Sequence, residues 1–255
     1  MFPLVCLLLA FQTLGTWNGK TVGTSSGNIS SLDGKTIGTA SGNYNKWNNL
    51  NSPSGTTPIA LVQSAKAVGT TTSSTNFTGA NLFYISCHYY GSLSGVATDS
   101  QGNTYTSLTG QQNGGFGSWV QLFRATGTAS SSMTHACPGG TAGVTIAYGF
   151  SSGSPTYESQ SGAVAPSGGT IQPGSLTCSV NGCLYVTAMT LDQGGTTPTI
   201  NSGFSSPDGI ASVGGVNCGG FFSYLIQTTA AATNPTWDPN LTGFSVAVAM
   251  ADMKP

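Results

Sequence analysis

The sequence predicts an all-β protein: an antiparallel two-sheet β-sandwich, jelly-roll or Ig-like in topology, preceded by a short stalk of β-repeats. Three observations lead to this prediction. Short apolar stretches alternate with turn-rich gaps from residue 56 onward, and no helical period is sustained. The clearest stretches alternate apolar and small or polar residues with a period of two. A fifteen-residue repeat with hairpin turn signals precedes them.

Residues 1–15, MFPLVCLLLAFQTLG, form an apolar run. The run is too short for a membrane-spanning helix, which needs about 20 apolar residues, so no membrane span is predicted. It fits a secretory signal, with Thr13 and Gly15 as the small residues before a cleavage at Thr16. It fits equally an uncleaved segment that buries itself in an oligomer as an assembly anchor.

Residues 16–55 carry a repeat: TWNGKTVGTSSGNIS (16–30) is matched by SLDGKTIGTASGNYN (31–45). Asn18-Gly19 and Asp33-Gly34 favour two-residue type I′ turns, which need positive φ at both central positions. Each unit is therefore predicted to be a short hairpin followed by a Gly loop. One apolar pair per unit buries too little to fold alone, so neighbouring chains or the main domain must supply the remaining burial. The alternative is a flexible Gly/Ser linker.

The main domain is predicted over residues 56–255. In 144–150 the residues Val144, Ile146, Tyr148 and Phe150 share one face. The predicted strands are 58–63, 82–90, 118–124, 144–150, 183–190, 220–227 and 244–251, with weaker ones at 104–108 and 156–160. In 82–90 the shared face is Phe83, Ile85, Cys87 and Tyr89, and in 244–251 it is Phe244, Val246, Val248 and Met250. Antiparallel strands of this length separated by turns favour two sheets packed face to face.

Charge excludes several classes of partner. The chain has only six Lys and Arg and seven Asp and Glu, whereas roughly a quarter of the residues in an ordinary domain are charged. Binding of nucleic acid needs clustered cations, and the six here are scattered, so no nucleic-acid partner is predicted. An anionic membrane surface is disfavoured for the same reason.

Several segments of the domain resemble a recurrent family. They are GVATDSQGNTYTSL (95–108), WVQLFRATG (119–127), and the ending FFSYLIQTTAAA with TGFSVAVAMADMKP. They resemble a β-sandwich domain with a D-S-x-G-N-T-Y motif that occurs in predicted secreted bacterial proteins and in phage structural proteins. The NGKTIGTASGN repeats similarly resemble short repeats of phage tail and fibre proteins and of bacterial surface proteins. The resemblance implies a surface location and no established catalytic residues.

The cysteines predict cross-links. Cys87-His88 and His135-Ala136-Cys137 invite a zinc interpretation, but neighbours on a strand point to opposite faces, so the four groups cannot converge without a bulge. A Cys87–Cys137 disulfide, or two buried thiols, is favoured instead. Cys178 and Cys183 would bridge across a four-residue hairpin loop, whereas a two-residue turn at Asn181-Gly182 would leave Cys178 opposite Tyr185. A disulfide is favoured for this pair, and Cys218 is left unpaired.

Signals for metal binding and catalysis are weak. The segment Asp99–Asn103 could contribute two oxygen ligands to calcium, but no further acidic residue lies close by, so an Asx turn with Gly102 at positive φ is predicted. GSLSG (91–95) fits G-x-S-x-G but lacks the helix of a nucleophile elbow. Glycoside hydrolysis needs two carboxylates, and no partner can be identified for Glu158, the single glutamate. No enzymatic activity, metal or cofactor is predicted.

Aromatic side chains could bind a surface glycan by stacking. The candidates are Trp119, Trp237, Tyr89 and Tyr90, although aromatic residues more often fill the core. The first functional expectation is a structural component of a virion or an extracellular filament, which assembles through its N-terminal region into a homo-oligomer or with other structural subunits. The alternative is a secreted bacterial adhesin with a glycan-binding sandwich. Both place the protein outside the cell or on a virion surface.

Overall fold

The computed structural model describes residues 58–255 except 92–93, 113–116, 140–141, 193–195, 213–217, 241–242 and 244, together with 16–17, 20–21, 31–32 and 35–36. The chain divides into two compact units, Met1–Thr57 and Pro58–Pro255. The predictions for the apolar segment 1–15 and for the rest of the repeats lie outside the described residues. Those residues contain no helix, and hence none that could cross a bilayer. The all-β prediction is confirmed.

Two short hairpins are described in the N-terminal unit. Strand β1 (Thr16–Trp17) pairs antiparallel with β2 (Lys20–Thr21), and β3 (Ser31–Leu32) pairs with β4 (Lys35–Thr36). Two residues connect the paired strands in each case, Asn18-Gly19 and Asp33-Gly34, which are the predicted turn positions. The repeat therefore forms hairpins as predicted, and their assembly into a stalk stays a prediction.

The first large sheet is built from residues 60–151. Its strands are β5 (Ala60–Val68), β6 (Leu82–Tyr90), β8 (Thr106–Gln112), β9 (Ser118–Thr126) and β11 (Ala142–Ser151). They lie in the order β5-β11-β6-β9-β8, and every pairing is antiparallel. The predicted strands 58–63 and 104–108 thus extend further than expected, since both are edge strands with weaker apolar patterns.

The second large sheet is built from residues 156–254. Its strands are β12 (Thr156–Ala165), β14 (Cys183–Leu191), β16 (Asp208–Ile210), β17 (Gly219–Gln227) and β20 (Val246–Lys254). They lie in the order β12-β20-β14-β17-β16, again all antiparallel. β16 is absent from the predicted strands, because three residues are too few to show a period.

The two sheets have the same internal order: first, fifth, second, fourth and third strand of each segment. Both also carry a β-bulge at the same place. Val62 and Gln63 lie opposite Gly149 in the first sheet, and Glu158 and Ser159 lie opposite Asp252 in the second. Residues 58–151 and 152–255 are therefore a structural repeat, and the chain passes from one large sheet to the other only between β11 and β12. An Ig-like domain, in contrast, passes between its sheets several times.

The main core lies between the two large sheets. It combines alternate residues of β6, β9 and β11 with alternate residues of β14, β17 and β20. Its largest members are Leu82, Tyr84, Leu122, Ile146, Tyr148, Phe150, Leu184, Val186, Phe222 and Met253. Tyr148 stacks on Phe222 across the sheets, with ring centroids 4.3 Å apart. Because Val144, Ile146, Tyr148 and Phe150 all belong to this core, the predicted shared face of β11 is confirmed.

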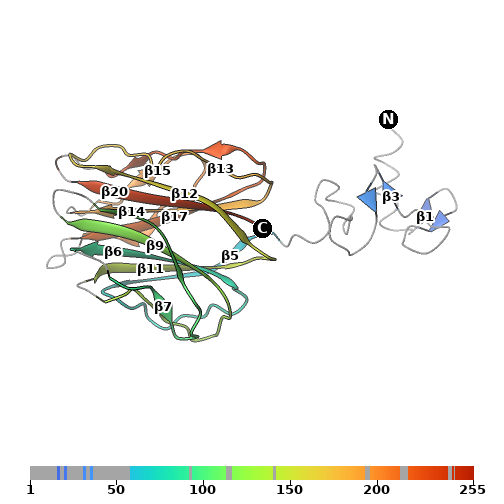
Figure 1. Cartoon of the computed structure of the whole chain (residues 1–255), viewed down its shortest axis with the longest axis horizontal. Helices are drawn as coiled ribbons and strands as arrows, with labels where there is room; N and C mark the ends of the chain where they lie inside the picture. Colours follow the sequence, from blue (N-terminus) through green and yellow to red (C-terminus); the bar gives the residue numbers. More distant parts are fainter. Residues whose placement is uncertain are drawn as a thin grey trace. The chain divides into compact units, whose positions relative to one another are not determined.

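The outer faces of both sheets are covered by connecting segments, which Figure 1 shows above and below the two sheets. These segments form two-stranded pairs: β7 (Thr98–Asp99) with β10 (His135–Ala136), β13 (Leu176–Thr177) with β18 (Ala232–Thr233), and β15 (Thr199–Ile200) with β19 (Trp237–Asp238). Separate apolar clusters lie beneath them. Phe83, Ile85, Cys87 and Tyr89 share one of these clusters, as predicted. The central strands are buried on both faces for this reason.

Candidate functional site

The four predicted glycan-stacking residues have different environments. Trp237 is fully buried, and its indole N–H donates to Thr187 Oγ1 at 3.1 Å. Tyr89 is also buried, with its hydroxyl donating to the Pro138 carbonyl at 2.9 Å. Trp119 is half-buried against the cluster that contains Tyr89. Tyr90, at 45 % exposure, is the one of the four with an accessible ring, so a shared aromatic platform is not formed.

Cys87 and Cys137 form a disulfide with their Cα atoms 5.8 Å apart. The predicted opposition of Cys87 and His88 is confirmed: Cys87 lies in the outer cluster of the first sheet, whereas the His88 ring lies against Gly220 of the second sheet. A Cβ atom at position 220 would be 2.4 Å from that ring. The two sulfurs are therefore linked to each other, and the four groups do not converge on a zinc site.

Both histidines are enclosed by protein. His88 makes one hydrogen bond, between Nε2 and Ser86 Oγ at 3.1 Å, and no described residue bonds its Nδ1. Neither ring nitrogen of His135 has a partner among the described residues, and its ring packs edge-on to Phe77 at 4.7 Å. Burial lowers the pKa of His88 to about 3 and that of His135 to about 4, the latter against a small opposing effect of Asp99. Both are neutral at pH 7 and out of reach of a substrate.

The Asp99 loop is the predicted Asx turn. One carboxylate oxygen of Asp99 accepts the N–H of Gln101 at 2.8 Å and that of Asn103 at 3.2 Å. The other accepts the Asn103 side-chain amide and the Tyr105 hydroxyl, both at 2.9 Å. Gly102 has a φ of 73°. Because the carboxylate already accepts four hydrogen bonds, the loop does not offer it to calcium.

Cys178 and Cys183 form the second disulfide, with Cα atoms 6.3 Å apart. Both hairpin registers considered for this segment are wrong. β13 pairs with β18, while β14 is paired on its two sides by β17 and β20, so no position beside β14 is left for β13. The N–H of Cys178 instead donates to the Tyr185 hydroxyl at 2.8 Å.

Glu158 lies directly against this disulfide. Its Oε2 is 2.8 Å from Cys178 Sγ and accepts the Ser179 N–H at 3.0 Å. Its Oε1 accepts the Ser179 hydroxyl at 2.5 Å and lies 3.5 Å from Lys254 Nζ. Burial alone would raise the pKa of Glu158, but the hydrogen bonds from Ser179 and the Lys254 charge outweigh it and hold the pKa below its ordinary value. Glu158 is therefore an ionised carboxylate that Ser179 and Lys254 hold in place beside the disulfide.

A second carboxylate, Asp252, lies beside Glu158 in the bulge. Asp252 is fully buried, and its Oδ1 accepts both the N–H and the hydroxyl of Ser159, at 2.6 and 2.7 Å. No described residue donates to Oδ2. Burial raises the pKa of Asp252. The hydrogen bonds from Ser159 lower this pKa, and the Glu158 charge raises it by a smaller amount, so that the pKa lies above its ordinary value. This neighbour of Glu158 is not predictable from the sequence, because the register between β12 and β20 brings the two together across 94 positions of the chain.

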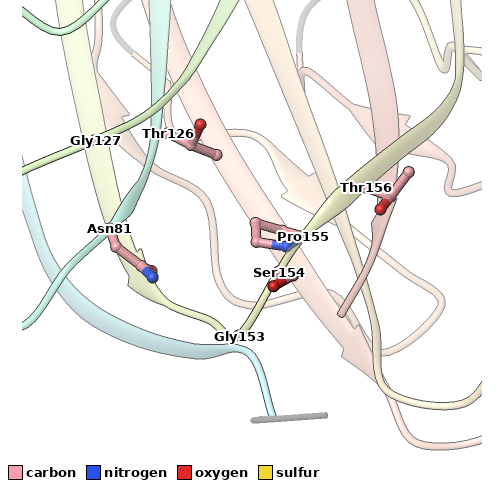
Figure 2. Close-up of a pocket in the computed structure, with 7 residues that line it drawn as sticks. All are labelled: Asn81, Thr126, Gly127, Gly153, Ser154, Pro155 and Thr156. Atoms are coloured by element: carbon pink, nitrogen blue, oxygen red, sulfur yellow. The ribbon is translucent and has the colours of Figure 1, made fainter. Parts of the chain in front are cut away.

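An open pocket of about 470 Å³ lies at the β12 end of the domain. Figure 2 shows Gly153, Ser154, Pro155 and Thr156 on one side of it, with Asn81, Thr126 and Gly127 on the other. The Asn81 side chain is already committed, because it donates to the Ser152 carbonyl and accepts the Ser152 N–H and hydroxyl at 2.8–2.9 Å. Exposed hydroxyls and a prolyl ring remain, with no ionisable group, so the pocket suits only a neutral polar ligand. It is not close to Tyr90, which lies at the far end of β6 from Asn81.

The remaining catalytic signal, GSLSG (91–95), includes residues 92 and 93, which lie outside the described residues. Comparison with family models, with curated proteins and with solved structures finds no match to this chain.

Proposed function

We propose that this chain is a non-catalytic structural or surface protein, a component of a virion or of an extracellular filament. It assembles into a homo-oligomer, or with other structural subunits, through its N-terminal region, and it displays residues 58–255 as a β-sandwich. The likeness of its motifs to phage structural proteins and to secreted bacterial proteins supports this class of function.

The use of the ionisable side chains carries the proposal. Asp99 closes a turn, and Asp208 ties the edges of the two sheets by accepting from Lys66 at 2.5 Å and from the Tyr148 hydroxyl at 3.0 Å. Asp252 accepts two hydrogen bonds from Ser159 within the bulge, and both histidines are neutral and buried. General acid–base catalysis needs such groups at a place that a substrate can reach. Asp99 and Asp208 are instead engaged in hydrogen bonds within the domain, and the two histidines are enclosed by protein, which supports a non-catalytic role.

Location outside the cell is supported by the disulfides. Two of them, Cys87–Cys137 and Cys178–Cys183, cross-link the described domain. Disulfides persist in oxidising surroundings and are rare in the cytosol. A low-charge exterior rich in Ser, Thr, Asn and Gly is compatible with a displayed surface.

Light scattering on native material tests the assembly step. The full chain is expected to be a stable homo-oligomer, and a chain that starts at Pro58 is expected to be a monomer with the same far-UV circular dichroism per residue of its domain. Pro58–Pro255 is a compact unit with its own core, so this truncation is a fair comparison. Intact mass would show whether residues 1–15 are retained. A native monomer whose first residue is Thr16 would contradict the assembly role.

The alternative function, a secreted adhesin with a glycan-binding sandwich, is favoured by one observation: the neutral pocket of Figure 2. Sugars offer hydroxyls and an apolar face, which hydroxyl side chains and the Pro155 ring complement. Glycan-array binding by the full chain, lost in Pro155→Asp and retained in Tyr90→Ala, would support a site in this pocket. Loss in Tyr90→Ala alone would place the site elsewhere, and no binding at all would remove the adhesin alternative.

A further inference from the structure

Three groups that ligate metals converge on the outer face of the second sheet. A carboxylate oxygen of Glu158 and the sulfurs of Cys178 and Cys183 all lie within 4.8 Å of one another. Cys178 directly follows β13, Cys183 is the first residue of β14, and Glu158 lies in the bulge of β12. We propose that Cys178, Cys183 and Glu158, once the disulfide is reduced, form a zinc-binding site. This inference is independent of the proposed structural role.

The surroundings of the sulfurs suit the reduced state. Cys178 Sγ is 2.8 Å from Glu158 Oε2, and Cys183 Sγ is 3.0 Å from the Val180 carbonyl oxygen. In the disulfide neither sulfur carries a hydrogen, so neither contact is a hydrogen bond. In the dithiol both become S–H···O hydrogen bonds. The reduced pair therefore fits the existing positions of its neighbours, with both sulfurs still directed toward the Glu158 carboxylate or the adjacent turn.

Groups that hold a ligand carboxylate in place are present too. Ser179 donates to both oxygens of Glu158, and Lys254 lies beside Oε1, which leaves Oε2 facing the sulfur. Behind Glu158, Ser159 is bonded twice to Asp252. Outer partners of this kind orient metal ligands and tune their affinity. The unpartnered Oδ2 of the fully buried Asp252 adds a second acidic group next to Glu158.

The fold does not require this cluster. At the equivalent bulge of the first sheet, Gly149 takes the place of Asp252 and is covered by Phe77 and Ala80, whose atoms would be 2.5 and 3.0 Å from a Cβ there. Apolar side chains therefore occupy the place that the Asp252 carboxylate takes in the second sheet. A buried carboxylate costs free energy unless it is fully hydrogen-bonded. The strand order shared by the two sheets therefore does not require the carboxylates and sulfurs that lie at the bulge of the second sheet.

The ligand types select zinc. Thiolates favour soft or borderline ions, and two thiolates with one carboxylate and a water suit tetrahedral Zn²⁺, whereas Ca²⁺ and Mg²⁺ take oxygen ligands. Both sulfurs are buried, but Ser179 and Val180 are exposed and the Glu158 side chain is 16 % exposed, so the fourth position faces solvent. A water can complete the coordination from that side.

The chemistry needs a reductant. Two molecules of a small thiol supply two electrons and two protons and become a disulfide. One phosphine together with one water molecule does the same: the phosphine supplies the two electrons and takes the oxygen of the water as a phosphine oxide, and the water supplies the two protons. In both cases the S–S bond breaks and each cysteine sulfur gains a proton. Zinc then displaces the two thiol protons and binds the two thiolates. Reducing surroundings would load the site. A small-molecule disulfide would release the metal, because it accepts two electrons from the two thiolates as their disulfide re-forms and is itself reduced to two thiols.

Zinc titration of the full chain tests the proposal. The chain is reduced with a phosphine, desalted without oxygen, and titrated with Zn²⁺ in competition with a chromophoric chelator. The reduced chain is expected to bind about one zinc ion, and the oxidised chain none. Co²⁺ in place of Zn²⁺ should give a near-ultraviolet thiolate-to-metal charge-transfer band. Glu158→Gln is expected to weaken binding by at least the ~10–100-fold seen for losses of outer partners.

Matched variants separate this site from the other cysteines. Cys178→Ser should abolish binding, while Cys137→Ser and Cys218→Ser should retain it. Equal zinc uptake by the oxidised and reduced wild-type chain, or no uptake by a chain whose thiols are shown to be reduced, would overturn the proposal without any variant. Wild-type affinity in a folded Cys178→Ser chain would overturn it as well.

Discussion

The two halves of the displayed domain, residues 58–151 and 152–255, share a strand order and a bulge but fill that bulge differently. In the first half the bulge faces Gly149, which Phe77 and Ala80 cover. In the second it faces Asp252, beside Glu158 and the Cys178–Cys183 disulfide. The same strand order is thus compatible with a bulge that apolar side chains cover and with a bulge that carries carboxylates. The residues that cover the bulge can therefore differ between the halves while the strand order stays the same.

The halves also differ in how they are cross-linked and in which titratable groups they bury. The Cys87–Cys137 disulfide spans 50 positions, whereas Cys178–Cys183 spans five. Both buried histidines lie in the first half, and the buried Asp252 lies in the second. Four measurements follow from this contrast.

The largest expected effect is at the apolar closure of the first half. Phe77 is fully buried and packs on Phe83 and His135 as well as over Gly149. Phe77→Ala is expected to lower the free energy of unfolding by about 3–5 kcal/mol, because it leaves a cavity. Urea denaturation followed by fluorescence measures it, with the exposed Val180→Ala as a control near zero. An effect below about 1 kcal/mol would mean that Phe77 does not close the bulge.

The two disulfides should contribute unequally. Constraint of the unfolded chain grows with the length of the closed loop, which gives about 4 kcal/mol for Cys87–Cys137 and about 2 kcal/mol for Cys178–Cys183. The double variants Cys87→Ala/Cys137→Ala and Cys178→Ala/Cys183→Ala, compared by denaturant unfolding, test the difference. A larger loss of unfolding free energy for the Cys178/Cys183 variant would show that this disulfide stabilises the folded protein through its contacts with Glu158 and not through the loop that it closes.

Acid should destabilise the first half through its histidines. Their pKa values, about 3 for His88 and about 4 for His135, lie below the unfolded value, so the unfolded chain binds more protons below pH 6.5. Stability is full above that pH and falls toward pH 4. Each histidine is expected to account for about 2 kcal/mol between pH 7 and pH 5. His135→Leu should remove its share of the slope, and an unchanged slope would contradict the burial.

Ionisation of Asp252 should lower the free energy of unfolding as the pH rises, which is the opposite pH dependence to that of the histidines. Its effect should be the smallest of the four. Its raised pKa means that the folded chain binds the proton more tightly than the unfolded chain, so ionisation of Asp252 destabilises the fold above that pKa. Asp252→Asn removes the buried charge and keeps an oxygen for Ser159. It is expected to raise stability at pH 7 by about 1 kcal/mol. Ser159→Ala is the matched control and should lower stability. A loss of stability in Asp252→Asn would show that its charge supports the bulge.

Much of the fold could be predicted from residue patterns. The apolar alternation of 144–150 placed Val144 to Phe150 in the core, and Asp99 and Gly102 identified the Asx turn, because both depend on near neighbours in the chain. The repeat of the two halves escaped detection, since equivalent core positions hold different side chains, such as Tyr84 and Val186. The two-residue strands of the outer layers are too short to show a period.

The candidate site was predictable only in part. Pairing of Cys178 with Cys183 follows from their closeness in the sequence, but the predicted hairpin around them does not form, because β17 and β20 occupy both sides of β14. Trp237 and Tyr89 were considered for sugar stacking and are buried under the outer segments. Burial of an aromatic ring depends on which distant segment of the chain covers it, and the residues next to the ring in the sequence do not indicate that segment.

The sequence by itself determined the all-β class, the approximate positions of the longer strands, the hairpins of the N-terminal repeat and the low charge, because each depends on composition or on residues a few positions apart. The tertiary structure alone decided that two equal halves face each other and that Glu158, Asp252, Cys178 and Cys183 gather at one bulge. Such a gathering depends on the register between strands almost a hundred residues apart, where a single-residue slip would turn every side chain to the other face.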